Sequence, residues 1–74
     1  MVRYRVEIDT FGISCCERVI RRNVSLAKAW RIAERAARRG VARFGGSLTR
    51  SNWGVRGGRF PSLYRSATIR AERI

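Results

Sequence analysis

The stretch "SLAKAWRIAERAARRGVARF", residues 25–44, decides the fold. It is rich in alanine and arginine, which are strong helix formers, and Ser25 carries the hydroxyl that commonly caps a helix N-terminus. At about 100° per residue, one apolar stripe emerges. Its members are Leu26, Trp30, Ala33, Ala37 and Phe44, flanked by Ala29, Gly40 and Val41. The sequence therefore predicts an amphipathic helix that ends either at Gly40 or before the Gly45-Gly46 pair.

The side of this helix opposite the apolar stripe is cationic. Its members are Lys28, Arg31, Arg35, Arg38 and Arg39, with Glu34 at the edge. Five cations along about three turns can follow a phosphate backbone, and each neutralised phosphate steepens the salt dependence of binding. The alternative is an ordinary solvated helix face, and the sequence leaves both interpretations open.

Two strands are predicted before the helix. Apolar residues alternate with Arg3, Arg5, Glu7 and Asp9 over residues 2–9, which is typical of a strand with one buried face. A turn over residues 10–13 and a second strand over residues 13–24 follow, and the imperfect alternation of the second leaves its register open.

Two more strands are predicted after the helix, over residues 48–55 and 63–71. The stretch between them, "SNWGVRGGRFPS" (residues 51–62), holds glycines and a proline that weaken a central strand, so it is predicted to be a hairpin loop. Its "RGGRF" segment is similar to a single arginine-glycine-glycine element of RNA-binding proteins. Trp53 and Phe60 are candidates for stacking on bases, with Arg56 and Arg59 beside them. Aromatic side chains that fold back onto the core are the alternative.

The predicted order β-β-α-β-β indicates an α+β fold in a single domain over residues 1–74. It consists of an antiparallel sheet with one amphipathic helix packed on one face. We expect Leu26 and Trp30 to pack against the apolar face of the sheet. The other face is expected to present Arg3 and Arg5, with Tyr64, Thr68 and Arg70, to solvent or to a partner.

Charge is the most informative property of the composition. Seventeen basic residues, all arginine except Lys28, face five acidic ones, which gives a net charge of +12 and a pI near 11.8. Such a field attracts polyanions, and the planar guanidinium group binds phosphate, guanine edges or carboxylate in a bidentate manner. DNA, RNA, a nucleoprotein complex or an acidic protein surface are therefore the candidate partners. A charge that only maintains solubility is the alternative.

Catalysis, metal binding and membrane insertion are not predicted. The chain has no histidine and few carboxylates, and Glu7 and Asp9 share their strand face with two arginines that can pair with them. Cys15 and Cys16 are adjacent and poorly placed for a disulfide, so we expect both to stay reduced and to matter more for stability than for binding. No zinc site and no cofactor are expected. The absence of a long apolar run or signal peptide predicts a cytosolic protein.

Two short strands, a helix opening with "SLAKAWRIA" (Ser25–Ala33) and further strands resemble several small phage and mobile-element proteins, among them anti-CRISPR inhibitors. The resemblance implies an inhibitor that docks on a nucleoprotein effector, and it assigns no functional residue. Together, these observations predict a non-enzymatic basic protein that binds nucleic acid or a protein–nucleic-acid complex. A protein-only inhibitor that binds acidic surfaces of its target is the alternative.

Overall fold

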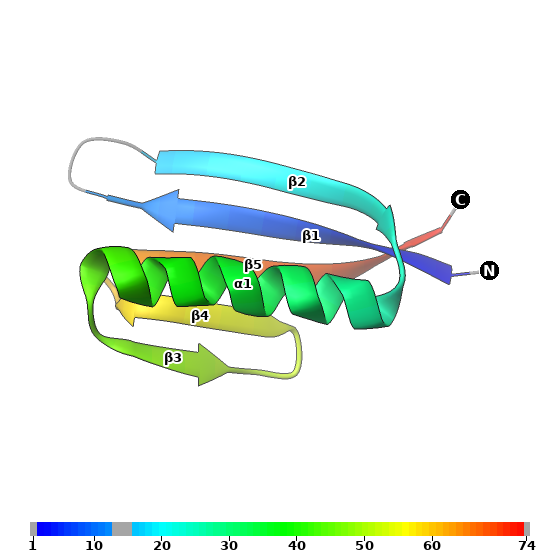
Figure 1. The fold of residues 1–74 in the computed structure, drawn as a ribbon. Coiled ribbons are helices and arrows are strands. Elements are labelled where there is room, and N and C mark those ends of the chain that lie inside the picture. Colours follow the sequence, from blue (N-terminus) through cyan, green and yellow to red (C-terminus); the bar gives the residue numbers. More distant parts are fainter. Residues whose placement is uncertain (1, 13–15, 74) are drawn as a thin grey trace.

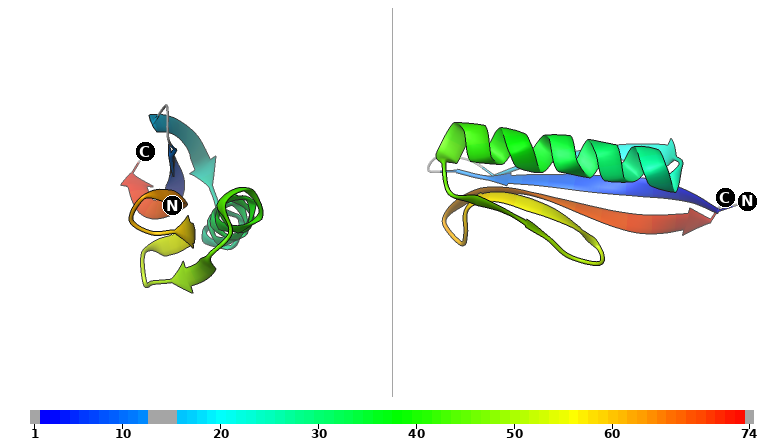
Figure 2. Two further views of the ribbon diagram at one scale, coloured as in Figure 1. Left: turned by 90° about the vertical axis from the view of Figure 1, so that its left-hand side faces the viewer. Right: turned by 60° about the horizontal axis from the view of Figure 1, so that its bottom comes forward.

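A computed structural model describes residues 2–12 and 16–73 of the chain as one helix and five strands (Figure 1). In chain order the elements are β1 (Val2–Phe11), β2 (Cys16–Val24), α1 (Leu26–Phe44), β3 (Ser47–Arg50), β4 (Gly54–Arg59) and β5 (Leu63–Arg73). The strands form a single sheet in the order β2-β1-β5-β4-β3, and the four neighbouring pairs are antiparallel. Helix α1 covers one face of this sheet (Figure 2). The predicted α+β class, with an antiparallel sheet and one helix on one face, is confirmed.

The alternation predicted for the two long strands is also confirmed. In β1 and β5 the register pairs Val6 with Ile69 and Ile8 with Ala67, so the apolar residues of both strands face the helix. Strand β2 pairs with β1 from Phe11 back to Tyr4, with a register shift before Val24. Asn23 has φ 58° at this irregularity, which explains why the alternation of β2 is imperfect in the sequence.

Helix α1 begins and ends where capping chemistry places it. The Ser25 hydroxyl accepts a hydrogen bond from the Lys28 backbone N–H at 3.2 Å, as a helix N-cap does. The helix continues through Gly40 and ends at Gly45, whose φ of 76° favours glycine. Of the two predicted ends, the later one is therefore correct.

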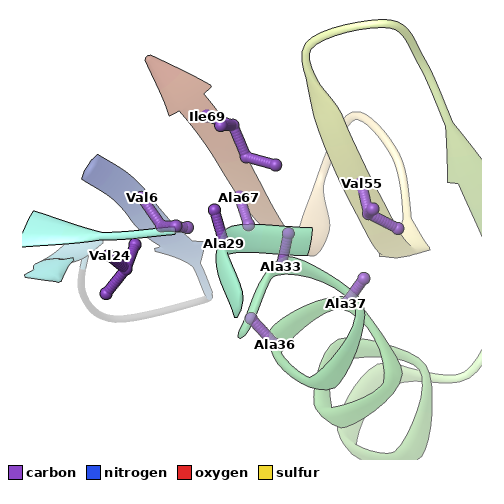
Figure 3. Packing of buried hydrophobic residues seen from close by; sticks show 9 residues of the cluster. All are labelled: Val6, Val24, Ala29, Ala33, Ala36, Ala37, Val55, Ala67 and Ile69. Carbon is purple, nitrogen blue, oxygen red and sulfur yellow. The ribbon is translucent and has the colours of Figure 1, made fainter. Parts of the chain in front are cut away.

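The core consists of small side chains. Ala29, Ala33, Ala36 and Ala37 of α1 face Val6, Val24, Val55, Ala67 and Ile69 of the sheet (Figure 3). Gly40 and Gly57 let the helix approach β4 closely, because a Cβ on Gly57 would lie 1.9 Å from the Ala37 carbonyl oxygen and one on Gly40 would lie 2.3 Å from the Gly57 oxygen. The helix therefore sits directly on β4 and β5.

Two expectations need correction. Leu26 was expected to pack against the sheet but is 46% exposed, because the alanines of α1 occupy the positions that face the sheet, whereas Trp30 is partly buried and packs against the core as expected. The prediction of a single loop over residues 51–62 is wrong for the middle of that stretch. Gly54–Arg59 forms β4, which lies between β3 and β5, and only residues 51–53 and 60–62 form turns.

In the described residues, no helix is long and apolar enough to cross a membrane.

Candidate nucleic-acid interface

The open face of the sheet, on the side away from α1, holds a network of ion pairs. Arg5 Nε lies 3.1 Å from Glu7 Oε2, without hydrogen-bond geometry, and Arg70 Nε lies 3.6 Å from the same oxygen. Glu72 Oε2 accepts a hydrogen bond from Arg22 at 2.8 Å and lies 3.8 Å from Arg5. These carboxylates neutralise much of the positive charge on this side.

Arg18 and Arg3, two further cations of the sheet, are also engaged by neighbouring residues. Arg18 Nε donates to Asp9 at 2.7 Å, and this hydrogen bond, with the charge of Asp9, raises the pKa of the Arg18 guanidinium. Arg3 donates to the side chain and the backbone oxygen of Asn23 at 2.9 and 3.0 Å. Arg3 and Arg5, which the sequence offers as partner-binding residues, are therefore occupied by contacts within the sheet.

The cations on the outer face of α1 are arranged differently. Lys28, Arg31, Arg35, Arg38 and Arg39 are all exposed, and no carboxylate of the described residues lies within ion-pair distance of them. Glu34, the one acidic residue of the helix, is engaged by Arg50 of β3 at 3.1 Å. Arg50 also lies over the Trp30 ring, 4.4 Å from its centroid. The outer face of α1 thus carries uncompensated positive charge at short intervals.

A groove runs between α1 and β2. Its apolar lining consists of Ile8, Val19, Ile32 and Ala36, and its polar lining consists of Thr10, Glu17, Arg21, Arg35, Arg39 and Arg65. The volume of the groove is about 320 Å³. Four arginines from three elements therefore converge on one concave surface with a single carboxylate among them.

The candidates from the glycine-rich stretch lie elsewhere. Trp53, in the turn between β3 and β4, is 73% exposed, and its backbone oxygen accepts a hydrogen bond from the Ile69 N–H at 2.7 Å. Arg56 lies over the Phe60 ring, 3.7 Å from its centroid, and Phe60 makes an edge contact with Tyr64. The side chains of Trp53 and Arg56 border a shallow pocket of about 140 Å³ on the open face of the sheet.

Arg59, by contrast, reaches the end of the helix. A Cβ on Gly45 would lie 3.4 Å from Arg59 Nε, so the guanidinium group sits beside the C-terminal cap of α1. A cation at this end interacts favourably with the helix dipole. This placement gives Arg59 a structural role.

The structure thus separates the predicted site residues. It brings the five helix cations together on one surface, leaves Trp53 and Arg56 on the opposite side of the molecule, and engages Arg3 and Arg5 within the sheet. Sequence reasoning missed Arg21 and Arg65. The sequence feature that could have identified them is an arginine at a helix-facing position of β2 or β5, where a strand covered by a helix would carry an apolar residue.

Cys16 is exposed, and Cys15 lies outside the described residues. That both thiols stay reduced and matter more for stability than for binding stays a prediction. Within residues 2–12 and 16–73, no group of three or more histidine, cysteine or acidic side chains is placed to hold a metal ion.

Neither the protein-family models, nor the curated proteins, nor the solved structures compared with this chain match it. The chain's function is therefore inferred from the geometry and charge of its own residues.

Proposed function

We propose that this protein binds nucleic acid, alone or within a protein–nucleic-acid complex, through the cationic outer face of α1. Its role is binding without catalysis. The observation that carries the proposal is the unequal distribution of carboxylates: four of the five form ion pairs on the sheet face or at β3, and none pairs with the five helix cations.

Spacing along α1 supports a linear polyanion as the partner. Residues three and four apart lie on one helix face, so Arg31, Arg35 and Arg38 form a row in which the Cβ atoms of neighbours are about 5–6 Å apart. Exposed guanidinium groups at this spacing suit successive phosphates, because each arginine donates several N–H groups in a plane. Contacts of this type carry no base information, so the binding is expected to depend weakly on sequence.

The test is a salt series of binding measurements with a matched control. Fluorescence anisotropy is measured for a duplex and for a single strand, with wild type, with Arg31→Gln plus Arg35→Gln, and with Arg18→Gln plus Arg22→Gln. Both double variants lose two positive charges, so the two variants have equal net charge. The control pair loses only surface ion pairs, which contribute little to stability.

We expect the helix pair to lower the slope of log K against log salt by about 1.8 on duplex DNA, roughly 0.9 for each lost phosphate contact. The control pair should leave the slope within about 0.5 of wild type. Equal losses for both pairs would show that net charge alone attracts nucleic acid. If wild type binds neither probe at low salt but retains a defined protein after nuclease treatment, the partner is an acidic protein surface instead.

A further inference from the structure

The groove between α1 and β2 exists because the helix is displaced toward the other side of the sheet. The contacts of Gly40 and Gly57 hold α1 on β4 and β5. Strand β2 lies at the far edge of the sheet from β4, next to β1 (Figure 1). Its helix-facing side is consequently not covered by α1.

The residues of β2 that face this space differ from those of a covered strand. The register places Glu17, Val19 and Arg21 opposite Thr10, Ile8 and Val6, which are the helix-facing residues of β1. A strand packed beneath a helix would carry apolar side chains at all three positions. The charged residues indicate that this side of β2 contacts solvent or a charged ligand.

The floor and the rim of the groove have different chemistry. Ile8, Val19 and Ile32 supply an apolar floor, and Arg21 and Arg35 stand on opposite rims, one on β2 and one on α1. Arg65 of β5 also lines the groove, and its Nε donates to the buried Thr10 hydroxyl at 3.0 Å. An apolar floor beneath convergent cations complements a ligand that is both flat and anionic.

We propose that this groove holds an unpaired stretch of a nucleic-acid strand, with a base on the apolar floor and its phosphates on the arginines. The proposal rests on the proposed function and narrows its ligand to single-stranded nucleic acid. Arg21, Arg35, Arg39 and Arg65 are the phosphate contacts, and Ile8, Val19 and Ile32 are the base contacts.

The dimensions favour a single strand over a duplex. The uncovered part of the sheet is about one strand wide, which is roughly 5 Å. One unpaired base with its sugar and phosphate can enter such a groove, whereas a double helix, whose major groove alone is about 12 Å wide, cannot. A duplex can therefore reach the outermost cations of the helix but not the floor.

The test compares arginines of α1 that line the groove (the groove pair) with arginines of α1 that lie outside it (the crest pair). Arg35→Gln plus Arg39→Gln removes two groove arginines, and Arg31→Gln plus Arg38→Gln removes two arginines that do not line the groove. A second matched pair compares Arg21→Gln with Arg22→Gln, which are adjacent in β2 but on opposite faces. The probes are a short oligodeoxythymidylate, the abasic strand of equal length, and a duplex of equal length.

For the oligothymidylate, we expect the groove pair to lower the salt slope by about 1.4, or roughly 0.7 per contact, and the crest pair by less than half of that. Arg21→Gln should weaken binding several-fold more than Arg22→Gln does. The abasic strand should bind several-fold more weakly than the thymidylate, since it has no base for the floor. On the duplex, the groove and crest pairs should have equal effects.

Equal effects of the two helix pairs on the single strand, or equal affinity for the abasic strand, would overturn the groove as the site. Tight binding of the duplex with no binding of the oligothymidylate would overturn it as well, while leaving the proposed function intact. If the wild-type protein binds none of the three probes, both proposals are contradicted. Circular dichroism of each variant shows whether it is folded, and an unfolded pair is replaced in the comparison by the Arg21 and Arg22 variants.

Discussion

The substitution Gly57→Ala tests the close packing of α1 on β4. A Cβ at this position would lie 1.9 Å from the Ala37 carbonyl oxygen and 2.6 Å from the carbonyl carbon. Ordinary contact begins near about 3.5 Å, so the two backbones must separate by roughly 1.5 Å. Both atoms belong to regular secondary structure, so no side-chain rotation can relieve the overlap.

The expected cost follows from this geometry. Overpacking a core costs about 1–3 kcal/mol, and a backbone obstacle places Gly57→Ala near the upper end. The loss of chain entropy in the unfolded state offsets about 0.4–1 kcal/mol. A net loss of about 2 kcal/mol is a large part of the roughly 4–11 kcal/mol typical of a 74-residue chain.

Urea denaturation followed by far-UV circular dichroism measures this loss. With an m-value of about 1 kcal/mol/M, the midpoint should fall by about 2 M. The control is Ala71→Val, which adds side-chain carbon at an exposed position of β5 and should change stability by less than about 0.5 kcal/mol. A Gly57→Ala midpoint equal to or above wild type would refute the close approach of helix and strand.

Three further predictions concern the cap, the thiol and the exposed tryptophan. Ser25→Ala should lower the free energy of unfolding by about 1 kcal/mol because the Lys28 N–H loses its acceptor, and an unchanged urea midpoint would contradict this. Cys16→Ser should change the free energy of unfolding by less than about 0.5 kcal/mol since the residue is exposed, and a larger loss would show that its thiol packs against the protein. Trp53→Ala should leave stability unchanged and weaken binding to a long single strand by roughly fivefold, with no effect on duplex; unchanged single-strand affinity would make residues 51–53 only a turn.

The sequence predicts those parts of the fold whose signals are local. The alternation in β1 and β5 and the Ser25 cap depend on neighbouring residues, so they are legible without tertiary structure. Strand β4 was missed because Gly54, Gly57 and Gly58 have the composition of a loop. Their small size permits close contacts of Gly57 with Ala37 of α1, and of Gly54 and Gly58 with Ala67 and Tyr64 of β5, and local composition does not reveal such tertiary contacts.

The candidate site divides in the same way. The cationic row on α1 follows from helical periodicity alone, and the structure places it on an exposed surface. The groove depends on how far the helix is displaced across the sheet, which the glycine contacts decide. Arg21 lies on β2, whose register the sequence left open. Arg65 lies on β5, and the sequence did not specify which element faces it.

The placement of the carboxylates favours the proposed binding role over solubility alone as the use of the positive charge. A charge that only keeps the protein soluble works at any surface position, so acidic residues would be expected among the cations of every face. Here Glu7, Asp9 and Glu72 are gathered on the open face of β1 and β5, where they pair with Arg5, Arg18, Arg22 and Arg70. Much of the excess charge is left on α1 and along the groove, where a low-dielectric wall and convergent guanidinium groups strengthen the local field. This one-sided arrangement agrees with the proposed binding surface, and the proposal predicts that a variant with two of the sheet-face acids moved to helix positions remains soluble and binds nucleic acid more weakly than wild type.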